Sequence, residues 1–330
     1  MAELAELAEP GWVAAHLFHQ GDLDALLVEA VHPLVGALVA DGLAAGWFYL
    51  RHWEGGLHVR LRVRPRSAAE TAEIRDKVLA GCRPYLAAHP SVHRISPAEY
   101  AESAAKLARL EGADRYETAQ RAPDGIDFRP YRREHRRYGP AVEAMERHQE
   151  ESSRLALDLL RSRPELPQRD TAGLALLLLA WFAAEPEPAR LAPRVTGDAV
   201  PPDPVGGSPA LWRAAVDRRY RQQRDRLAGL AGRMQALAAD PGTPARAGLF
   251  GAWTGSVRAV AAAAAPAGTA APAGTAEASA AGAGAGADLL ALLDRCAHLA
   301  CNRLGVSLVE EGYLRVLAAR TVHLLAGVPV

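Results

Sequence analysis

Basic and aliphatic side chains alternate along one short stretch of the N-terminal half, from Leu57 to Arg64. Successive side chains of a β-strand point to opposite faces, so this stretch predicts a strand with an apolar face and a basic face. The basic positions are His58, Arg60, Arg62 and Arg64, with Arg51 on the strand expected to pair with them. Guanidinium groups in this pattern suit a carboxylate, a peptide carbonyl or a developing enolate. The alternative is a solvent-exposed sheet face decorated with charge.

A second group of reactive side chains lies near the C-terminus. His298 and Asn302 are four residues apart and would share one face of a helix. Ser307 and Tyr313 follow a break at Gly305 and share a face only loosely. A histidine, a tyrosine and a serine near one helix junction could relay protons. The alternative is a buried histidine bonded to a carbonyl, with the tyrosine at a helix edge.

Neither a metal nor a cofactor is expected. Cys296 and Cys301 flank His298, but they are five residues apart and no second cluster of Cys or His supplies further zinc ligands. The chain contains no GxxxxGK[ST], GxGxxG, GxSxG or HExxH motif. Cofactor-free acid/base or electrostatic catalysis is therefore expected, or no catalysis at all.

Composition excludes several classes of function. The 330 residues include 38 acidic and 38 basic side chains, so no bulk field attracts nucleic acid or membrane. No signal peptide is recognisable, and no run of eighteen or more uncharged apolar residues occurs. The three cysteines do not suggest a disulfide framework. We expect a soluble cytoplasmic protein that binds neither nucleic acid nor membrane.

Hydrophobic periodicity predicts strands and helices in the first half and helices alone in the second. In the first half we expect strands at 11–19, 47–53 and 57–64, helices at 23–44 and 68–88, and a short helix with a polar loop across 95–130. In the second half we expect helices at 140–163, 170–184, 208–239, 244–263, 288–304 and 306–326, with a long surface connection at 185–207. Residues 264–287 are of Ala/Gly/Pro low complexity and are expected to be a disordered insert.

Several segments, taken in order, resemble the C-terminal domains of lantibiotic dehydratases and the related thiopeptide cyclases. The early segment Trp12-Val-Ala-Ala-His16-Leu-Phe is similar to the start of that domain, and the hairpin with its His-x-Arg-x-Arg pattern is similar to the domain's central hairpin. Residues 131–139 resemble its Tyr-x-x-Glu-x-x-Arg-Tyr-Gly motif, which contains Arg137, and residues 146–160 resemble the segment after it. His298, Asn302 and Arg303 resemble a late His-x-x-x-Asn-Arg-Leu-x-Gly motif, although this chain is one residue shorter before its glycine.

The resemblance implies a single domain over residues 1–330, of α+β class, with a mostly antiparallel sheet packed against helices. It also implies one of two activities on a ribosomally made peptide. In the lyase branch, glutamylated Ser or Thr loses glutamate to give dehydroalanine or dehydrobutyrine. In the cyclase branch, two dehydroalanines of a leader-bearing precursor join by a formal aza-[4+2] cycloaddition, and loss of water and leader leaves a pyridine.

We expect the cyclase branch, for three reasons. No large glutamylation domain accompanies this domain in the chain, the hairpin sequence Arg-His-Trp-Glu-Gly-Gly resembles the cyclases, and so does the C-terminal Ser/Tyr pair. The expected catalytic residues are His298, Ser307 and Tyr313. The expected substrate-binding residues are Arg51, His58, Arg60, Arg62, Arg137 and Asn302. The expected partner is the precursor peptide, comprising a leader and a dehydrated core, with contacts to other biosynthetic enzymes also conceivable.

Overall fold

The chain divides into two compact units. The first contains Met1–Arg133 and Ala156–Arg163, and the second contains Glu134–Leu155 and Pro164–Val330. The computed structural model describes residues 11–92, 95–111, 113–131, 133–196, 208–240, 242, 248–265 and 278–328. The assignment of residues 1–330 to a single domain stays a prediction.

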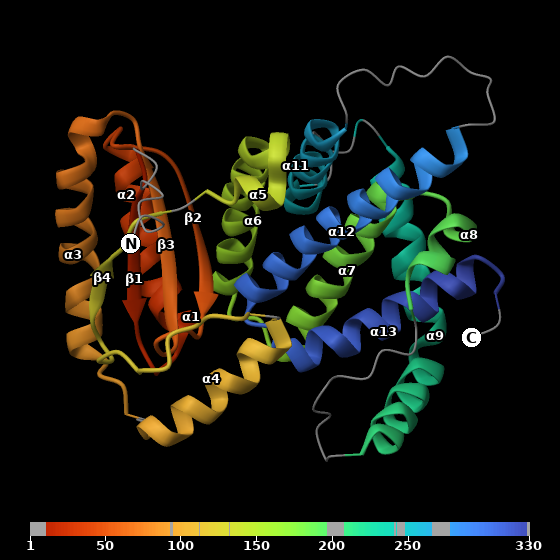
Figure 1. The fold of residues 1–330 in the computed structure, drawn as a ribbon, viewed down its shortest axis with the longest axis horizontal. Helices are drawn as coiled ribbons and strands as arrows, with labels where there is room; N and C mark the ends of the chain where they lie inside the picture. The colour runs from red at the N-terminus through yellow and green to blue at the C-terminus, as the bar shows by residue number, and fades with distance from the viewer. Residues whose placement is uncertain are drawn as a thin grey trace. The chain divides into compact units, whose positions relative to one another are not determined.

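The first unit is built on one four-stranded antiparallel sheet (Figure 1). Its strands are β1 (Val13–Phe18), β2 (Ala44–His52), β3 (His58–Pro65) and β4 (Ile126–Phe128), in the order β2-β3-β1-β4. Three of them lie where the sequence predicted strands. The fourth was missed, because its three residues are too few to show an alternating pattern.

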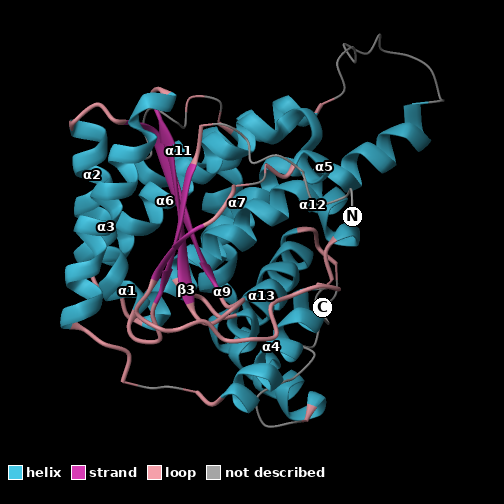
Figure 2. Cartoon of the chain, turned by 60° about the vertical axis from the view of Figure 1, so that its left-hand side comes forward, coloured by secondary structure: helices cyan, strands magenta, loops and turns pink. Residues whose placement is uncertain are grey.

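Helices cover the aliphatic face of this sheet. The first runs as α1 (Leu23–Ala25), a π-helical turn (Leu26–Val31) and α2 (His32–Ala40), and α3 (Thr71–Ala88) follows the hairpin. The π-helical turn lies directly before Pro33, which has no N–H to donate to the preceding turn. Both helices lie along the sheet in Figure 2. Their buried Leu26, Leu38, Ile74 and Val78 form one core with the aliphatic side chains of β3.

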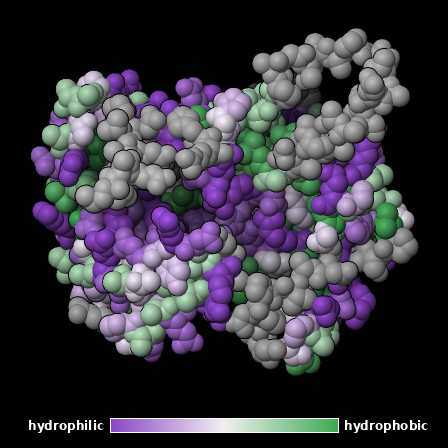
Figure 3. Space-filling view, in the orientation of Figure 1, coloured by the Kyte–Doolittle hydropathy of each residue, from purple (hydrophilic) through white to green (hydrophobic). Residues whose placement is uncertain are grey.

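Residues Leu23–Ala40 are long and apolar enough to cross a membrane, judged by length and composition only. The segment contains Asp24 and Glu29, and its Leu26, Leu27 and Val31 are buried within the protein. A core helix of a folded protein passes the same test. On the face drawn in Figure 3, hydrophilic residues predominate among the described ones and apolar residues form separate patches.

The segment between α3 and β4 contains α4 (Pro97–Glu111) and a loop, as predicted. The loop is fixed to the β2–β3 turn through Tyr100 of α4. The Gly55 N–H donates to the Tyr100 hydroxyl (2.7 Å), which donates to the Glu117 carbonyl (2.7 Å). Gly55 has a φ of +81°, and a Cβ there would lie 2.8 Å from a carboxylate oxygen of Glu117. The positive φ favours glycine at this position, and the two hydrogen bonds of Tyr100 hold the hairpin and the loop together.

The second unit is helical in all its described secondary structure, which confirms the expected α+β class with a largely helical C-terminal half. The apolar α7 supplies much of its core, with every residue from Gly173 to Phe182 buried. In contact with α7 lie α9, α11, α12 and α13. The elements are α5 (His135–Tyr138), most of α6 (Val142–Arg161), α7 (Leu166–Ala184), α8 (Pro188–Leu191), α9 (Pro209–Ala239), α11 (Gly248–Ala264), α12 (Ala278–Leu304) and α13 (Leu308–Leu325).

The low-complexity insert at 264–287 and the connection at 185–207 are only partly described. Residues 266–277 and 197–207 lie outside the described residues, so disorder of the insert there stays a prediction. The structure begins α12 ten residues before the start that the sequence predicted, because alanine is a strong helix former even between glycines. The other connection contains the short helix α8, which was not predicted.

Candidate functional site

The basic side chains of β3 lie on the sheet face opposite α2 and α3. Antiparallel pairing places Ala14 and Phe48 beside Arg62, and His16 and Leu50 beside Arg60. His58 is 0% exposed and Arg62 is 9% exposed. The prediction of one apolar and one basic face is confirmed. The alternative of a solvent-exposed charged face is wrong for His58 and Arg62, and so this face must hold its charges by specific contacts.

Arg51 does not belong to this basic face. It pairs with Val59 on β3, and directly paired residues of an antiparallel sheet point to the same side, so its side chain lies with the aliphatic residues. There it forms an ion pair with Asp24 at the start of α1. The expectation that Arg51 joins the other arginines is therefore wrong, because Arg51 lies opposite Val59 and not opposite one of the basic positions of β3. His52 occupies the basic face instead, paired with His58.

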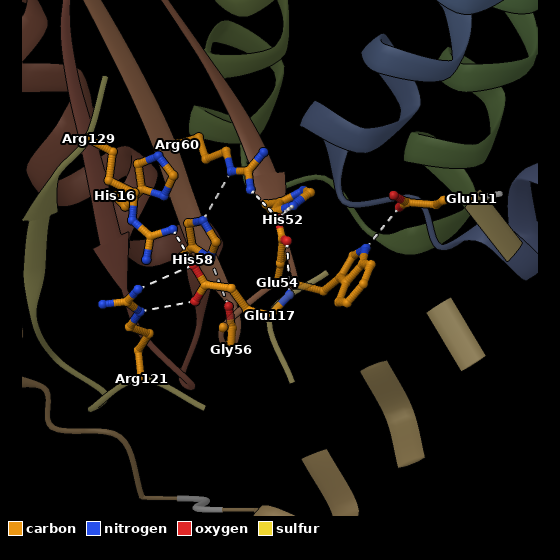
Figure 4. Close-up of polar contacts among 12 residues, drawn as sticks. His16, His52, Glu54, Gly56, His58, Arg60, Glu111, Glu117, Arg121 and Arg129 are labelled. Carbon is orange, nitrogen blue, oxygen red and sulfur yellow. Dashed lines mark hydrogen bonds and ion pairs between the residues drawn. The ribbon is translucent and has the colours of Figure 1, made fainter. Parts of the chain in front are cut away.

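Three histidines meet on the basic face (Figure 4). The rings of His16 and His58 are stacked with centroids 4.9 Å apart, and His52 meets His58 edge-on at 5.4 Å. Burial, together with the nearby Arg60 guanidinium, lowers the pKa of His58 to about 3. Burial and the Arg62 guanidinium lower the pKa of His16 still further. Both imidazoles are therefore neutral at physiological pH.

The protonation sites of these rings follow from their neighbours. His58 Nδ1 donates to the Gly56 carbonyl (2.8 Å), while its Nε2 accepts from Arg60 Nε (3.3 Å). His16 Nε2 lies 3.5 Å from an Arg62 guanidinium nitrogen, which can only donate, so the His16 proton sits on Nδ1. That Nδ1 is buried and has no hydrogen-bond partner among the described residues. Neither ring is suited to act as a base.

Two arginines near this face are already bound by the protein's own carboxylates. Arg60 pairs with Glu54 (3.0 Å), and Arg129 pairs with Glu117 (2.7 Å). A hydrogen bond from His52, with further help from the Glu117 N–H and the Arg60 charge, lowers the pKa of Glu54 to about 2 despite its partial burial. Both carboxylates thus carry full charge and neutralise their arginines.

Arg62 differs from these arginines. No carboxylate among the described residues forms an ion pair with it, and it has only 3.5 Å contacts with His16 and with its neighbour's carbonyl. Its guanidinium carbon lies 5.6 Å from the centre of the Tyr131 ring. Burial lowers the pKa of Arg62 from its ordinary value, yet a guanidinium stays protonated in proteins. Among the predicted binding arginines, Arg62 is thus the one whose charge no described carboxylate neutralises.

The second cluster lies in the other unit, around His298. His298 Nδ1 donates to Glu311 (2.9 Å), because a carboxylate can only accept. The other Glu311 oxygen accepts two hydrogen bonds from Arg315 (3.0 and 2.7 Å). Arg315 also pairs with Asp294, which accepts from the Trp181 indole (2.8 Å). This chain of contacts fixes the His298 ring and leaves the lone pair of the neutral imidazole on Nε2, where it can accept a proton.

The other predicted residues of this unit have different surroundings. Asn302 follows His298 by one turn of α12, as predicted. Ser307 is the N-cap of α13, and its oxygen accepts from the Glu310 N–H (3.2 Å). Tyr313 lies roughly 200° around α13 from Glu311, which binds His298, and the charged groups near its hydroxyl are Arg219 and Asp170. Arg137 is exposed and pairs with Glu134 (2.9 Å).

The arginine of the late motif, Arg303, has a structural role. Arg303 is fully buried and donates to Ser153 (2.9 Å), Ser152 (3.4 Å) and Gln149 (2.7 Å) on α6. Two segments distant in sequence are thereby joined through one satisfied buried cation. Arg303 therefore organises the second unit rather than presenting a charge to a ligand.

The cysteines offer no reactive thiolate. All three are buried, and burial raises the pKa of Cys82 and of Cys296 to about 12, and that of Cys301 further still. Among the described residues, no group of three or more His, Cys, Asp or Glu side chains is arranged to hold a metal ion.

Sequence reasoning missed several residues of both clusters. Glu311 is the most informative, because it lies thirteen residues after His298, across the helix break, where periodicity gives no signal. His16 and His52 could have been found by extending the alternating pattern to the neighbouring strands. The remaining two, Glu54 and Glu117, lie in loops and could not.

Comparisons with known proteins place these features in a family. The family model described as lantibiotic biosynthesis dehydratase C-term matches residues 12–322. No curated protein sequence matches the chain significantly. The solved structure of TbtD, a pyridine synthase from thiomuracin biosynthesis, is similar with a TM-score of 0.69 and 18% identity, over 96% of this chain and 99% of TbtD.

Two further solved structures are similar. TsrL has a TM-score of 0.57 and 19% identity, with 94% of each chain covered. MibB, the tRNA-dependent lantibiotic dehydratase from Microbispora sp. 107891, has a TM-score of 0.54 and 21% identity, over 98% of this chain but only 28% of MibB. These likenesses concern the fold. The family match covers nearly all of the sequence, and the chain therefore belongs to the family of lantibiotic dehydratase C-terminal domains.

Proposed function

We propose that the chain is a thiopeptide macrocyclase, a pyridine synthase that joins two dehydroalanines of a leader-bearing precursor peptide by a formal aza-[4+2] cycloaddition. The observation that carries this proposal is the pairing of its arginines. Arg60 and Arg129 are bound by Glu54 and Glu117 on the basic face, and Arg51 and Arg137 are bound by other carboxylates elsewhere.

This pairing distinguishes the two branches of the family by charge. A lyase must bind the carboxylate of a leaving glutamate, which is best served by free, bidentate guanidinium groups. Two fully charged glutamates beside that position repel a second carboxylate. A neutral peptide carbonyl or a partly charged oxyanion meets no such repulsion. The basic face therefore fits an uncharged dehydrated core peptide better than a glutamylated one.

The similarity of the fold supports the same choice. TbtD, whose name states that it is a pyridine synthase, has a TM-score of 0.69, whereas the dehydratase MibB has a TM-score of 0.54. A precursor peptide as partner and a cytoplasmic location follow from this proposal.

In the proposed reaction, one dehydroalanine reacts as its imidic-acid tautomer, a 2-azadiene, and the other serves as the alkene. Tautomerisation moves a proton from an amide nitrogen to the carbonyl oxygen. His298 is the group that accepts and returns this proton through Nε2, with Glu311 stabilising the imidazolium. Both ends of the 2-azadiene are carbon atoms, so cycloaddition with the alkene forms two C–C bonds. Loss of the hydroxyl as water and of the leader as its amide then leaves the aromatic pyridine.

The remaining side chains act by binding. Arg62 would hold a core-peptide carbonyl, helped by the neutral His58 and His16 rings beside it. Burial raises the pKa of Tyr313, so its hydroxyl keeps its proton and can donate to a second carbonyl. Asn302 offers an amide close to His298 on α12. Holding both reacting ends of a flexible peptide is worth roughly 7–11 kcal/mol in favourable cases.

One observation favours glutamate elimination as the second candidate. Arg62 has no carboxylate partner among the described residues and could bind a glutamate carboxylate. In that case Arg62 and His298 would be essential and Tyr313 dispensable.

Mass spectrometry of a synthetic leader-bearing peptide with two dehydroalanines tests the proposal. Incubation with the protein alone should release the leader as a discrete fragment and leave a macrocycle that contains a pyridine. An unchanged mass of a peptide shown to bind, together with loss of glutamate from a glutamylated peptide, would replace the proposal by the lyase.

A further inference from the structure

The helix α9 carries an unusual density of positive charge. Its 31 residues include seven arginines but only the two carboxylates of Asp217 and Asp225. Val216, Tyr220 and Leu227 form the buried side that anchors the helix in the second unit. Six of the arginines are exposed and form no ion pair or hydrogen bond with any described residue. They are Arg213, Arg218, Arg221, Arg224, Arg226 and Arg233.

Exposed arginines of another helix in the same chain behave differently. On α6, each exposed arginine pairs with a carboxylate one turn before it. The pairs are Arg147 with Glu143 (3.9 Å), Arg154 with Glu151 (3.1 Å) and Arg161 with Asp158 (3.8 Å). The exposed arginines of α6 thus have counter-charges at (i, i+3) and (i, i+4) spacing. On α9, Asp217 and Asp225 lie four residues from Arg221, but Asp217 pairs with Arg320 instead, and no ion pair joins Asp225 to a described residue.

The arrangement on α9 carries an electrostatic cost. Arg218, Arg221 and Arg224 follow one another at three-residue spacing, at which like charges destabilise a helix. Arg218 lies opposite the buried side, and Arg221 and Arg226 lie roughly 60–80° to either side of it around the helix, with Arg218 and Arg226 about 12 Å apart along the axis. These three residues form the arginine face. An anionic partner bound to the arginine face would offset the repulsion among these arginines.

We propose that the arginine face binds an acidic segment of the peptide substrate, outside the residues that react. The inference rests on the proposed function, which requires a peptide longer than its reacting core. The whole chain has no net charge, with 38 acidic and 38 basic side chains. A nucleic acid would extend beyond the arginine face onto this balanced surface, whereas a short acidic segment contacts the face alone. Docking at this face raises the local concentration of the core peptide without contributing to the chemistry.

Fluorescence anisotropy with defined probes tests the proposal. The probes are a fluorescein-labelled peptide of alternating Glu and Ser, the same peptide with Gln for Glu, and a labelled DNA duplex. One variant combines Arg218→Gln, Arg221→Gln and Arg226→Gln, since glutamine preserves helix propensity. The control variant combines Arg147→Gln, Arg154→Gln and Arg161→Gln on α6, which removes the same charge from exposed positions. Circular dichroism verifies that both variants keep their helices.

We expect the wild type to bind the Glu peptide in preference to the Gln peptide and the duplex, with an affinity that falls as salt rises. The α9 variant should bind it about tenfold more weakly, and the α6 variant as the wild type does. Equal losses in both variants, or no binding by the wild type, would overturn the inference, and tighter binding of the duplex would reassign the face to nucleic acid. Cyclisation of the two-dehydroalanine peptide is measured separately, so its failure would count against the proposed function and not against this face.

Discussion

The two clusters of polar residues use histidine in opposite ways. On the basic face of the sheet, His58 is surrounded by arginines and by other histidines, and burial keeps it neutral. At the junction of α12 and α13, His298 donates a hydrogen bond from Nδ1 to the buried carboxylate of Glu311. In the proposed function, the first arrangement would present fixed donors and cations to a substrate oxygen, and the second would accept and return a proton. The positions of the histidines in the sequence do not distinguish these two roles, whereas the charges of the groups around each histidine do.

The largest effect should come from removing the base. We expect His298→Ala to lower kcat for macrocycle formation by roughly 10² to 10⁴, the range for loss of a general acid/base. Glu311→Gln should lower it less and leave peptide affinity unchanged, because the amide keeps the shape but not the charge. His89→Ala is a matched control on an exposed histidine. Normal turnover by His298→Ala would end the assignment of proton transfer to this cluster.

A smaller effect should distinguish the two faces of the sheet. Arg62→Gln removes the unpaired guanidinium of the basic face, and we expect it to weaken binding of the core peptide by roughly 10-fold to 100-fold. Arg51→Gln removes an arginine from the opposite face and should leave binding and turnover close to wild type while lowering stability. The two variants are compared by peptide titration and by urea unfolding. Equal losses of peptide binding would show that the face of the sheet does not decide an arginine's role.

Sequence patterns located the elements better than the contacts between them. The alternation of residues 57–64 predicted β3 and its two faces, because the period of two is a property of any strand. The same pattern could not place Arg51, since the face of a neighbouring strand depends on register. The sequence also could not predict that the basic face is buried, because the alternating pattern is the same whether solvent or a loop covers that face. Ser307 was predicted to be catalytic, which stays a prediction, and its N-cap role could be recognised only from the geometry of α13.

A third effect concerns stability and pH. The pKa of His58 is about 3 in the folded protein, below the ordinary value of 6.5. Between these values His58 takes up a proton in the unfolded chain but stays neutral in the folded protein. The contribution of neutral His58 to folding stability is therefore complete above pH 6.5 and is lost as pH falls below it. We expect this residue to lower the free energy of unfolding by about 2 kcal/mol between about pH 7 and about pH 5.

Urea unfolding of the wild type and of His58→Gln at both pH values measures this contribution. The variant should be less stable at neutral pH, but its stability should change less on acidification, since glutamine does not titrate. His16 contributes in the same direction and remains in both proteins. Identical pH dependence in the two proteins would mean that His58 is solvated or protonated in the folded state.

The smallest effect should come from Ser307, where a catalytic and a capping role predict different results. Its oxygen accepts from the Glu310 N–H and the Glu310 carboxylate accepts from the Ser307 N–H, which forms a reciprocal cap. We expect Ser307→Ala to lower the free energy of unfolding by about 1 kcal/mol. Ser307→Asp should restore it, because aspartate also caps a helix. Turnover should change only as far as stability changes in both variants. Loss of turnover in a stable Ser307→Asp protein would show that the Ser307 hydroxyl takes part in catalysis.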